Sequence, residues 1–211
     1  MTSCSPRCAT VVKIGGGVLG DALRRRDTAA ACGYMAVLET VAGAARDHRV
    51  VVVPGGGPFA DAVRNVNAIL HVGDAPAHWM ATLAMDQHAH LIASRLAGAT
   101  LVTTAPAIAS AIEEGRIPVL APFQWLREAD PLPHSWDVTS DSIAAWVAGQ
   151  VGAARLVLVK PPGVRGDSSR HAHGVLVDAY FARALPPGVT SVIVPADDVW
   201  AIDSALRVPR P

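Results

Sequence analysis

Short runs of β-branched and apolar residues, each closed by glycine or proline, are the feature that most limits how this chain can fold. The six runs lie at 10–14, 50–53, 100–103, 118–120, 156–159 and 191–194. Because they are apolar throughout and do not alternate with polar residues, we expect strands that are covered on both faces. Ala- and Leu-rich stretches of helical length lie between them, at 33–48, 58–69, 76–97, 105–115 and 139–152.

This alternation of strand and helix predicts an α/β fold, a three-layer αβα sandwich with a mostly parallel central sheet. The chain has 211 residues, of which 51% are hydrophobic, and this is enough for one sizeable core. No stretch rich in Gly, Ser or Pro separates two cores. We therefore expect a single domain over 10–211, preceded by a disordered tail over 1–9.

The charge balance and the cysteines limit which partners and which cellular compartment we expect. Lys plus Arg and Asp plus Glu both number 18, so no long-range field would attract nucleic acid or an acidic membrane. Residues 1–9 lack the apolar stretch of a secretory signal, and no run reaches the roughly 18 apolar residues of a membrane span. The three cysteines are odd in number and argue against a disulfide framework. We expect a soluble cytoplasmic protein with small-molecule or protein partners.

We predict no metal site from the cysteines and histidines. The three candidate pairs are Cys4 with Cys8, His88 with His90, and His171 with His173. The cysteine pair has no second pair of ligands at a finger-like distance. The first histidine pair points in two directions on a helix. The second lies in a polar stretch, where solvation explains it as well as a metal would.

Lys13 stands in an otherwise apolar strand, TVVKI, one residue before a run of three glycines. A buried ammonium is costly unless it lies at the carboxyl end of its strand and pairs with a charge, and ligands of open α/β sheets bind at that end. Gly15, Gly16 and Gly17 let successive backbone N–H groups turn toward a bound oxyanion. Together these residues predict a phosphate-binding site.

A second glycine turn, VPGGGPF at 53–59, also follows an apolar strand and opens a helix. The positive end of that helix would add to the attraction that Gly55, Gly56 and Gly57 offer an anion. A tight strand-to-helix turn would by itself explain either glycine run. Because Lys13 lies next to the first of them, we interpret the two glycine turns as binding sites for two anionic ligands.

Two other phosphate-binding motifs fit the sequence less well. Gly15, Gly17 and Gly20 also satisfy the dinucleotide fingerprint G-x-G-x-x-G after a strand. That site needs an acidic residue at the end of the next strand, but the strand ending at Val53 continues into Pro-Gly-Gly-Gly. A P-loop is excluded because G-x-x-x-x-G-K-[ST] does not occur.

The segment HSWDVTSDS at 134–142 combines carboxylates, hydroxyls and an aromatic ring at the entrance to an Ala-rich helix. Ser140 and Asp141 fall in the first helical turn, where the helix dipole favours a carboxylate that can point back over the strand ends. A plain N-terminal cap is the alternative for Asp141 and for Asp137.

Neighbouring residues extend this prediction. His134 and Trp136 stand just before the same helix entrance and are further candidates for contact with a ligand. Asp74 and Thr139 are expected to cap the helices that follow them.

The motifs VVKIGGG, VVVPGGGPFADAVR and TSDSIAAW, in this order, resemble the amino acid kinase superfamily, which includes acetylglutamate, uridylate and isopentenyl phosphate kinases. Within it, PHSWDVTSDSIAAW is most similar to the kinases of methanofuran biosynthesis, which convert an aminomethyl-furanyl methyl phosphate to its diphosphate. The resemblance covers roughly 10–160. It implies the amino acid kinase fold, ATP and Mg²⁺ as cofactors, and a small anionic acceptor.

Carried onto this chain, the resemblance implies that Lys13 bridges the phosphates in the transition state and that Asp141 orients it. Gly15, Gly16 and Gly17 would bind the transferring group, and Lys160 would lie near the nucleotide. This agrees with phosphoryl transfer, which depends mainly on charge neutralisation and alignment. The residues expected to contact the acceptor are Gly55, Gly56, Gly57, His134, Trp136 and Ser140.

The sequence departs from the family after the strand that ends at Val159. The usual Thr-Asp-x-x-Gly-Val is replaced by Lys160-Pro-Pro-Gly-Val and a short polar stretch, and only Arg165 and Arg170 could replace a later basic residue. We therefore expect an acceptor-binding half over 10–155 and a reduced nucleotide-binding half over 156–211. A homologue that binds a nucleotide or oxyanion without turnover, for regulation or storage, is the alternative function.

A homodimer or larger homo-oligomer is also expected. The helix at 76–97 carries large apolar side chains on more than one face, at Trp79, Met80, Leu83, Met85 and Leu91. Burial against a second subunit as well as the sheet would account for this pattern.

Overall fold

In the computed structural model, which describes residues 9–25, 28–164 and 176–207, six strands form one sheet in the order β3-β4-β2-β1-β5-β6, and every neighbouring pair is parallel. The strands are β1 (Thr10–Ile14), β2 (Val50–Pro54), β3 (Ala99–Val102), β4 (Ile117–Leu120), β5 (Arg155–Lys160) and β6 (Thr190–Pro195). The helices are α1 (Gly16–Arg25), α2 (Thr28–Ala44), α3 (Gly57–Leu70), α4 (Asp74–Arg95), α5 (Ala105–Glu113), α6 (Phe123–Ala129), α7 (Ser140–Gln150), α9 (Phe181–Ala184) and α10 (Val199–Leu206).

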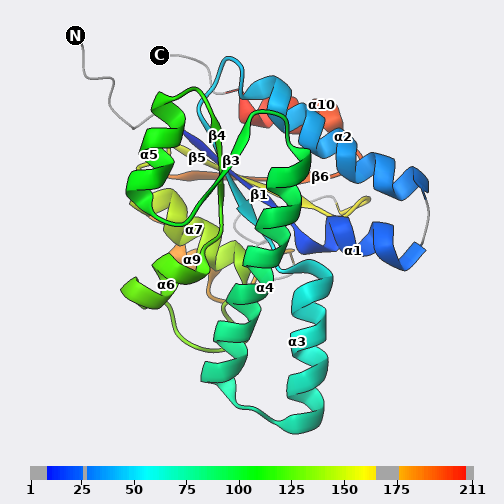
Figure 1. The fold of residues 1–211 in the computed structure, drawn as a ribbon, viewed down its shortest axis with the longest axis vertical. Helices are drawn as coiled ribbons and strands as arrows, with labels where there is room; N and C mark the ends of the chain where they lie inside the picture. Colours follow the sequence, from blue (N-terminus) through cyan, green and yellow to red (C-terminus); the bar gives the residue numbers. More distant parts are fainter. Residues whose placement is uncertain (1–8, 26–27, 165–175, 208–211) are drawn as a thin grey trace.

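Helices cover both faces of the sheet (Figure 1). Alternation along β1 sends Val12 and Ile14 into one apolar cluster, shared with α1, α2, α4 and α10. Val11 enters the other cluster, which α5, α6, α7 and α9 complete. The predicted three-layer αβα sandwich is confirmed.

All six strands agree with the sequence expectation to within one residue at each end. Among the described helices, the sequence did not foresee α1, whose first residue Gly16 lies inside the expected glycine turn, or the short α6 and α9. Helix α1 begins at a glycine, so no capping side chain in the sequence marks its start. Helices α6 and α9 have only seven and four residues, which is too short to show a helical period. Near the carboxyl end, Val199, Ile202 and Leu206 recur at helical spacing and lie in α10.

The strand order changes direction between β1 and β5: β2 pairs with one edge of β1, and β5 pairs with the other. In open α/β sheets the crevice beyond the carboxyl ends at such a reversal is the usual ligand site. Lys13 and Lys160 stand near the carboxyl ends of these two strands.

Helices α3 and α4 form a hairpin that extends past the sheet (Figure 1). Pro58 occupies the first turn of α3, and His71 ends it in a left-handed conformation with φ of 50°. Asp74 does not cap α4 as predicted: Gly73, with φ of 86°, precedes the helix, and Asp74 is its first residue. The Asp74 side chain is thereby left for another role.

Residues 1–8 of the expected tail lie outside the described residues, whereas Ala9 is buried and its carbonyl accepts a hydrogen bond from Ala154 N. Within the ranges that the structure describes, no helix has the length and apolar character needed to cross a membrane.

Candidate active site

Lys13 and Asp141 form a buried ion pair between the sheet and α7. Alternation along β1 points Lys13 toward the α7 layer, and its Nζ lies 2.8 Å from Oδ1 of Asp141. Each residue is only 4% exposed. The pair therefore lies in surroundings where electrostatic interactions are weakly screened.

Lys160 makes a second contact to the same carboxylate. Its Nζ donates to Oδ2 of Asp141 at 2.6 Å from the last position of β5. Two ammonium groups thus share one carboxylate, and the cluster carries one net positive charge. An unbalanced buried charge favours the binding of an anion.

The pKa values reflect this arrangement. Burial by itself would raise the pKa of Asp141, but the charges of Lys13 and Lys160 and their hydrogen bonds hold it below its usual value. Burial, followed by repulsion from Lys13, lowers the pKa of Lys160, although Asp141 opposes that change. An incoming phosphate would relieve the repulsion between the two ammonium groups.

Asp178 holds the start of α7 in place. Its Oδ2 accepts hydrogen bonds from the backbone N–H groups of Thr139 and Ser142 at 2.9 and 3.0 Å, and from the Thr139 hydroxyl at 2.7 Å. The Ser142 hydroxyl bonds to its other oxygen. The side chain of Thr139 makes no capping hydrogen bond, contrary to the expectation, because a carboxylate 39 positions away takes that role. Asp178 thus fixes the helical turn that carries Asp141.

The two glycine turns lie against each other. Gly15 N donates to Val159 O at 2.9 Å, and Gly55 N donates to Ile14 O at 2.8 Å. A Cβ atom on Gly16 would lie 2.1 Å from the backbone nitrogen of Gly57. No side chain fits there, so the first amides of α1 and α3, which have no partner within their helices, stay close together.

His88 supports the second turn from behind. Its Nδ1 lies 2.6 Å from Gly55 O, and its Nε2 lies 2.9 Å from the Tyr34 hydroxyl. Burial lowers the pKa of His88 to about 4, and Lys13 adds to this, against the opposing hydrogen bond with Gly55. The ring is therefore neutral near pH 7, with Nδ1 donating to the carbonyl and Nε2 accepting from Tyr34. His90, the other histidine of the H-x-H pair that was rejected as a metal site, is exposed.

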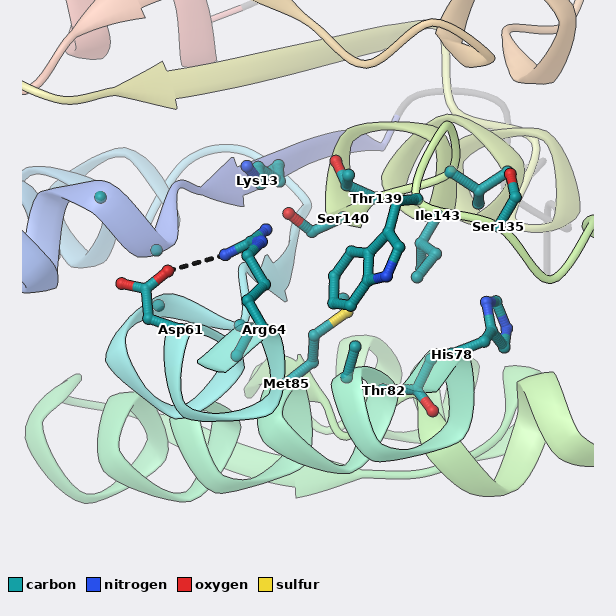
Figure 2. Close-up of a pocket in the computed structure, with 18 of the residues that line it drawn as sticks. Lys13, Asp61, Arg64, His78, Thr82, Met85, Ser135, Thr139, Ser140 and Ile143 are labelled. Atoms are coloured by element: carbon teal, nitrogen blue, oxygen red, sulfur yellow. Dashed lines mark hydrogen bonds and ion pairs between the residues drawn. The ribbon is translucent and has the colours of Figure 1, made fainter. Parts of the chain in front are cut away.

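A pocket of about 330 Å³ opens between the α3–α4 hairpin and the start of α7. It is lined by Lys13, Gly16, Gly17, Gly56, Gly57, Ala60, Asp61, Arg64, Asp74, His78, Ala81, Thr82, Met85, Ser135, Trp136, Val138, Thr139, Ser140 and Ile143. Figure 2 shows Lys13 and Arg64 toward one end and His78 at the other, with Met85 and Ile143 between them. The pocket thus has basic side chains at one end, an imidazole at the other, and both apolar and hydroxyl side chains between them.

A comparison with protein families identifies this arrangement. Residues 9–166 match the model of the amino acid kinase family. The chain belongs to this family. It is therefore a phosphotransferase of the kinase type, as its motifs predicted.

Among curated proteins, this amino acid kinase is similar to the [5-(aminomethyl)furan-3-yl]methyl phosphate kinase of Methanocaldococcus jannaschii. The two are 28% identical over 184 residues, which are 86% of this chain and 78% of the relative.

Solved structures of the same fold include UMP kinase from Ureaplasma parvum, with a TM-score of 0.68 and 17% identity over 94% of this chain and 97% of that one. Uridylate kinase from Archaeoglobus fulgidus has a TM-score of 0.64 and 15% identity, over 93% and 96%. UMP kinase from Bacillus anthracis has a TM-score of 0.65 and 13% identity, over 90% and 87%. At these identities the likeness concerns the fold.

Most of the residues predicted for the site of this kinase lie together. Those lining the pocket are Lys13, Gly16, Gly17, Gly56, Gly57, Trp136 and Ser140. The other predicted residues do not line the pocket but lie next to it. Asp141 contacts Lys13, and Lys160 contacts Asp141. Gly15 and Gly55 adjoin the lining glycines in the two turns. His134 is one layer further out: its ring stacks on His78 at a centroid distance of 4.6 Å.

Sequence reasoning missed Arg64 and Asp61 of α3. The guanidinium lies 2.7 Å from the Asp61 carboxylate and 5.2 Å from the centre of the Trp136 ring, at the exposed rim of the pocket. Gly57, Asp61 and Arg64 follow one another at helical spacing, and this spacing could have placed them on one face with the glycine turn.

The same signal existed on α4. Asp74, His78, Ala81, Thr82 and Met85 recur at intervals of three or four residues and line the pocket from a single helix face. The residues considered in the polar stretch after β5, Arg165, Arg170, His171 and His173, and the cysteine pair near the start, lie outside the described residues.

Proposed function

We propose that this chain transfers the γ-phosphoryl group of ATP to [5-(aminomethyl)furan-3-yl]methyl phosphate, giving the diphosphate, in the biosynthesis of a methanofuran-type cofactor. The observation that carries the proposal is the cluster in which Asp141 contacts both Lys13 and Lys160, beside two glycine turns and a pocket. The named acceptor comes from the relative that shares 28% identity over most of the chain.

In the proposed reaction, a phosphate oxygen of the acceptor attacks the γ-phosphorus, and the bond from that phosphorus to the bridging oxygen of ADP breaks. The acceptor oxygen is already ionised, so no general base is needed. Lys13 neutralises charge on the group in transfer, while Asp141 holds Lys13 in place. Lys160 serves the nucleotide side, and the amides of Gly15, Gly16 and Gly17 bind the transferring phosphate.

The acceptor is assigned to the pocket. Its phosphate would meet the amides of Gly56 and Gly57 and the nearby guanidinium of Arg64, and its ring would lie against Trp136. All residues that line the pocket fall between 13 and 143. This supports an acceptor-binding half over 10–155 and a nucleotide-binding half over 156–211.

ATP and Mg²⁺ are the proposed cofactors. The glycine amides and the two lysines suit the phosphates of ATP, because they present donors and positive charge. Within the described residues, no group of three or more His, Cys, Asp and Glu side chains could hold a metal. Mg²⁺ would thus be held chiefly by the nucleotide phosphates, where it supplies further positive charge. We place the reaction in the cytoplasm.

ADP release with the furan phosphate as acceptor tests this function, with UMP and N-acetylglutamate as comparison acceptors. We expect turnover with the furan phosphate and little with the others. The alternative, a homologue without turnover, predicts a ligand-dependent rise in melting temperature with no ADP formed. Equal or better turnover of UMP would contradict the proposed acceptor.

We also propose a homodimer or larger assembly. Of the apolar residues expected to reach a partner from α4, Met85 is buried within this chain, whereas Leu83 is 43% exposed. Ile69 and Leu70 at the end of α3 are exposed as well. The mass from light scattering should exceed that of one chain, and a monomeric mass at working concentration would contradict the proposal.

A further inference from the structure

The two ends of the acceptor pocket differ in charge. Lys13 and Arg64 are the only Lys or Arg residues among those lining the pocket in the described part of the chain, and both lie on the same side of it (Figure 2). His78 lies at the opposite end (Figure 2), and Asp74 precedes it by one helical turn. A long acceptor that fills the pocket would therefore present its second end to an imidazole and a carboxylate.

His78 is held rigidly, yet its ring nitrogens are unused. It is 8% exposed, and its ring stacks on His134 at a centroid distance of 4.6 Å with an interplanar angle of 20°. The ring centres of His78 and Trp79 are 4.8 Å apart in an edge-to-face arrangement. His134 is itself tied to Asp130 by a 2.7 Å contact. Neither ring nitrogen of His78 has a hydrogen-bond partner among the residues that the structure describes. Since these nitrogens are not among the fully enclosed polar atoms without a partner in the described residues, and His78 lines the pocket, they are open to a ligand there.

The surroundings of His78 favour a ring without charge. Burial lowers its pKa to about 4, and the stacked His134 contributes in the same direction, whereas Asp130 opposes it. One ring nitrogen of His78 therefore keeps its lone pair near neutral pH and accepts a hydrogen bond. Arg127 lies over the ring of Trp79 and does not line the pocket.

Asp74 adds negative charge at the same end. No ion pair links it to another residue in the described ranges, and it lines the pocket four positions before His78 on the same helix face. Among the described residues that line the pocket, no Lys or Arg follows His78 or Asp74 on this helix face, so a lone pair and a carboxylate there complement a group that both donates hydrogen bonds and carries positive charge.

We infer that Asp74 and His78 bind a primary ammonium group of the acceptor, so that the pocket selects a zwitterion with a phosphate at one end and an amine at the other. The inference rests on the proposed function, because that function places the acceptor phosphate at the glycine end. It goes further by assigning the residues that reject acceptors without the amine. Asp74 is exposed at the pocket, and a neutral or anionic end group would not form the ion pair that an ammonium group forms with it.

Three acceptors test the inference: the aminomethyl furan phosphate and two analogues with hydroxymethyl or methyl in place of aminomethyl. Binding is measured by calorimetry without ATP, and kcat/KM by ADP release. We expect the amine to exceed both analogues by about 10- to 100-fold, the factor that one charged hydrogen bond contributes. His78→Leu and Asp74→Asn should each reduce this preference, mainly through a higher KM for the amine.

His90→Leu is the matched control, because His90 lies exposed on the same helix and outside the pocket. It should keep the preference of the unaltered protein. Equal binding of the amine and either analogue, or an undiminished preference in both pocket variants, would overturn the inference. If the amine binds more tightly but no ADP forms, the proposed kinase function fails while the assignment of Asp74 and His78 stands.

Discussion

The ammonium of Lys13 lies 2.8 Å from Oδ1 of Asp141, although one residue belongs to the first strand and the other to the first turn of α7. The second oxygen of the same carboxylate accepts from Lys160 at 2.6 Å. Asp141 is therefore the shared counter-charge of two buried lysines, and the three residues should respond to substitution as one unit.

Replacing Lys13 should abolish turnover with little effect on folding. Lys13→Met removes the charge proposed to neutralise the transferring group, and we expect a rate loss on the order of a thousandfold or more. The free energy of unfolding should change by no more than about 1 kcal/mol, because Asp141 keeps Lys160 as its partner. ADP release and urea denaturation measure the two effects. Near-normal turnover would show that Lys13 has no role in transfer.

Asp141→Asn should reduce both turnover and stability. The substitution leaves two buried ammonium groups without their counter-charge, at a cost of roughly 3 kcal/mol or more. Adding Lys13→Met should recover part of that stability, because the repulsion between the lysines is removed, but turnover should stay low. Losses of turnover that simply add in the double variant would contradict a shared role.

The cap on α7 offers a test of positioning. Asp178→Ala removes the carboxylate that bonds the first turn of α7, and we expect about 1–2 kcal/mol of lost stability together with a clear fall in kcat. Asp198→Ala is the matched control, since Asp198 caps α10 through Ala201 N at 2.9 Å and does not line the pocket. It should cost similar stability and leave kcat unchanged. Equal kcat in both variants would show that the hydrogen bonds of Asp178 have no effect on catalysis.

His88 should control the acceptor side of the reaction. His88→Leu removes the donor to Gly55 O and should raise the KM for the acceptor by about tenfold, with a smaller change in kcat. His88→Asn places an amide N–H near the position of Nδ1 and should restore most of the affinity. If His88 merely filled the core, leucine would be tolerated better than asparagine, so the order of the two variants decides the question.

Acid should destabilise the protein through His78 and His88, which are buried. The pKa of His78 and that of His88 are both lowered, to about 4 from 6.5. Between these values the unfolded chain binds more protons than the folded one, so the free energy of unfolding falls as the pH drops from 6.5 toward 4. The loss should be on the order of 2–3 kcal/mol per histidine. Denaturation curves from pH 7 to pH 4 measure it; His88→Leu should flatten the dependence, and His90→Leu should leave it unchanged.

Much of the fold could be predicted because its signals are local. The strand bounds follow from continuous apolar runs, and parallel pairing follows from the helices between them. Lys13 and the glycines of both turns were expected at the strand ends, since a lysine in an apolar strand is costly unless a charge meets it there. The roles of these residues in phosphoryl transfer remain predictions.

The rest depended on which distant segments meet. Asp178 reaches Thr139 across 39 positions, His88 reaches Gly55 across 33, and nothing in the local pattern announces either contact. His134 was expected at the acceptor, but the packing of the loop before α7 puts His78 in front of it. Periodicity and turn chemistry act over a few residues and thus determine the elements from sequence alone. Strand register and helix packing decide which side chains share a site, because they are settled only when the whole core closes.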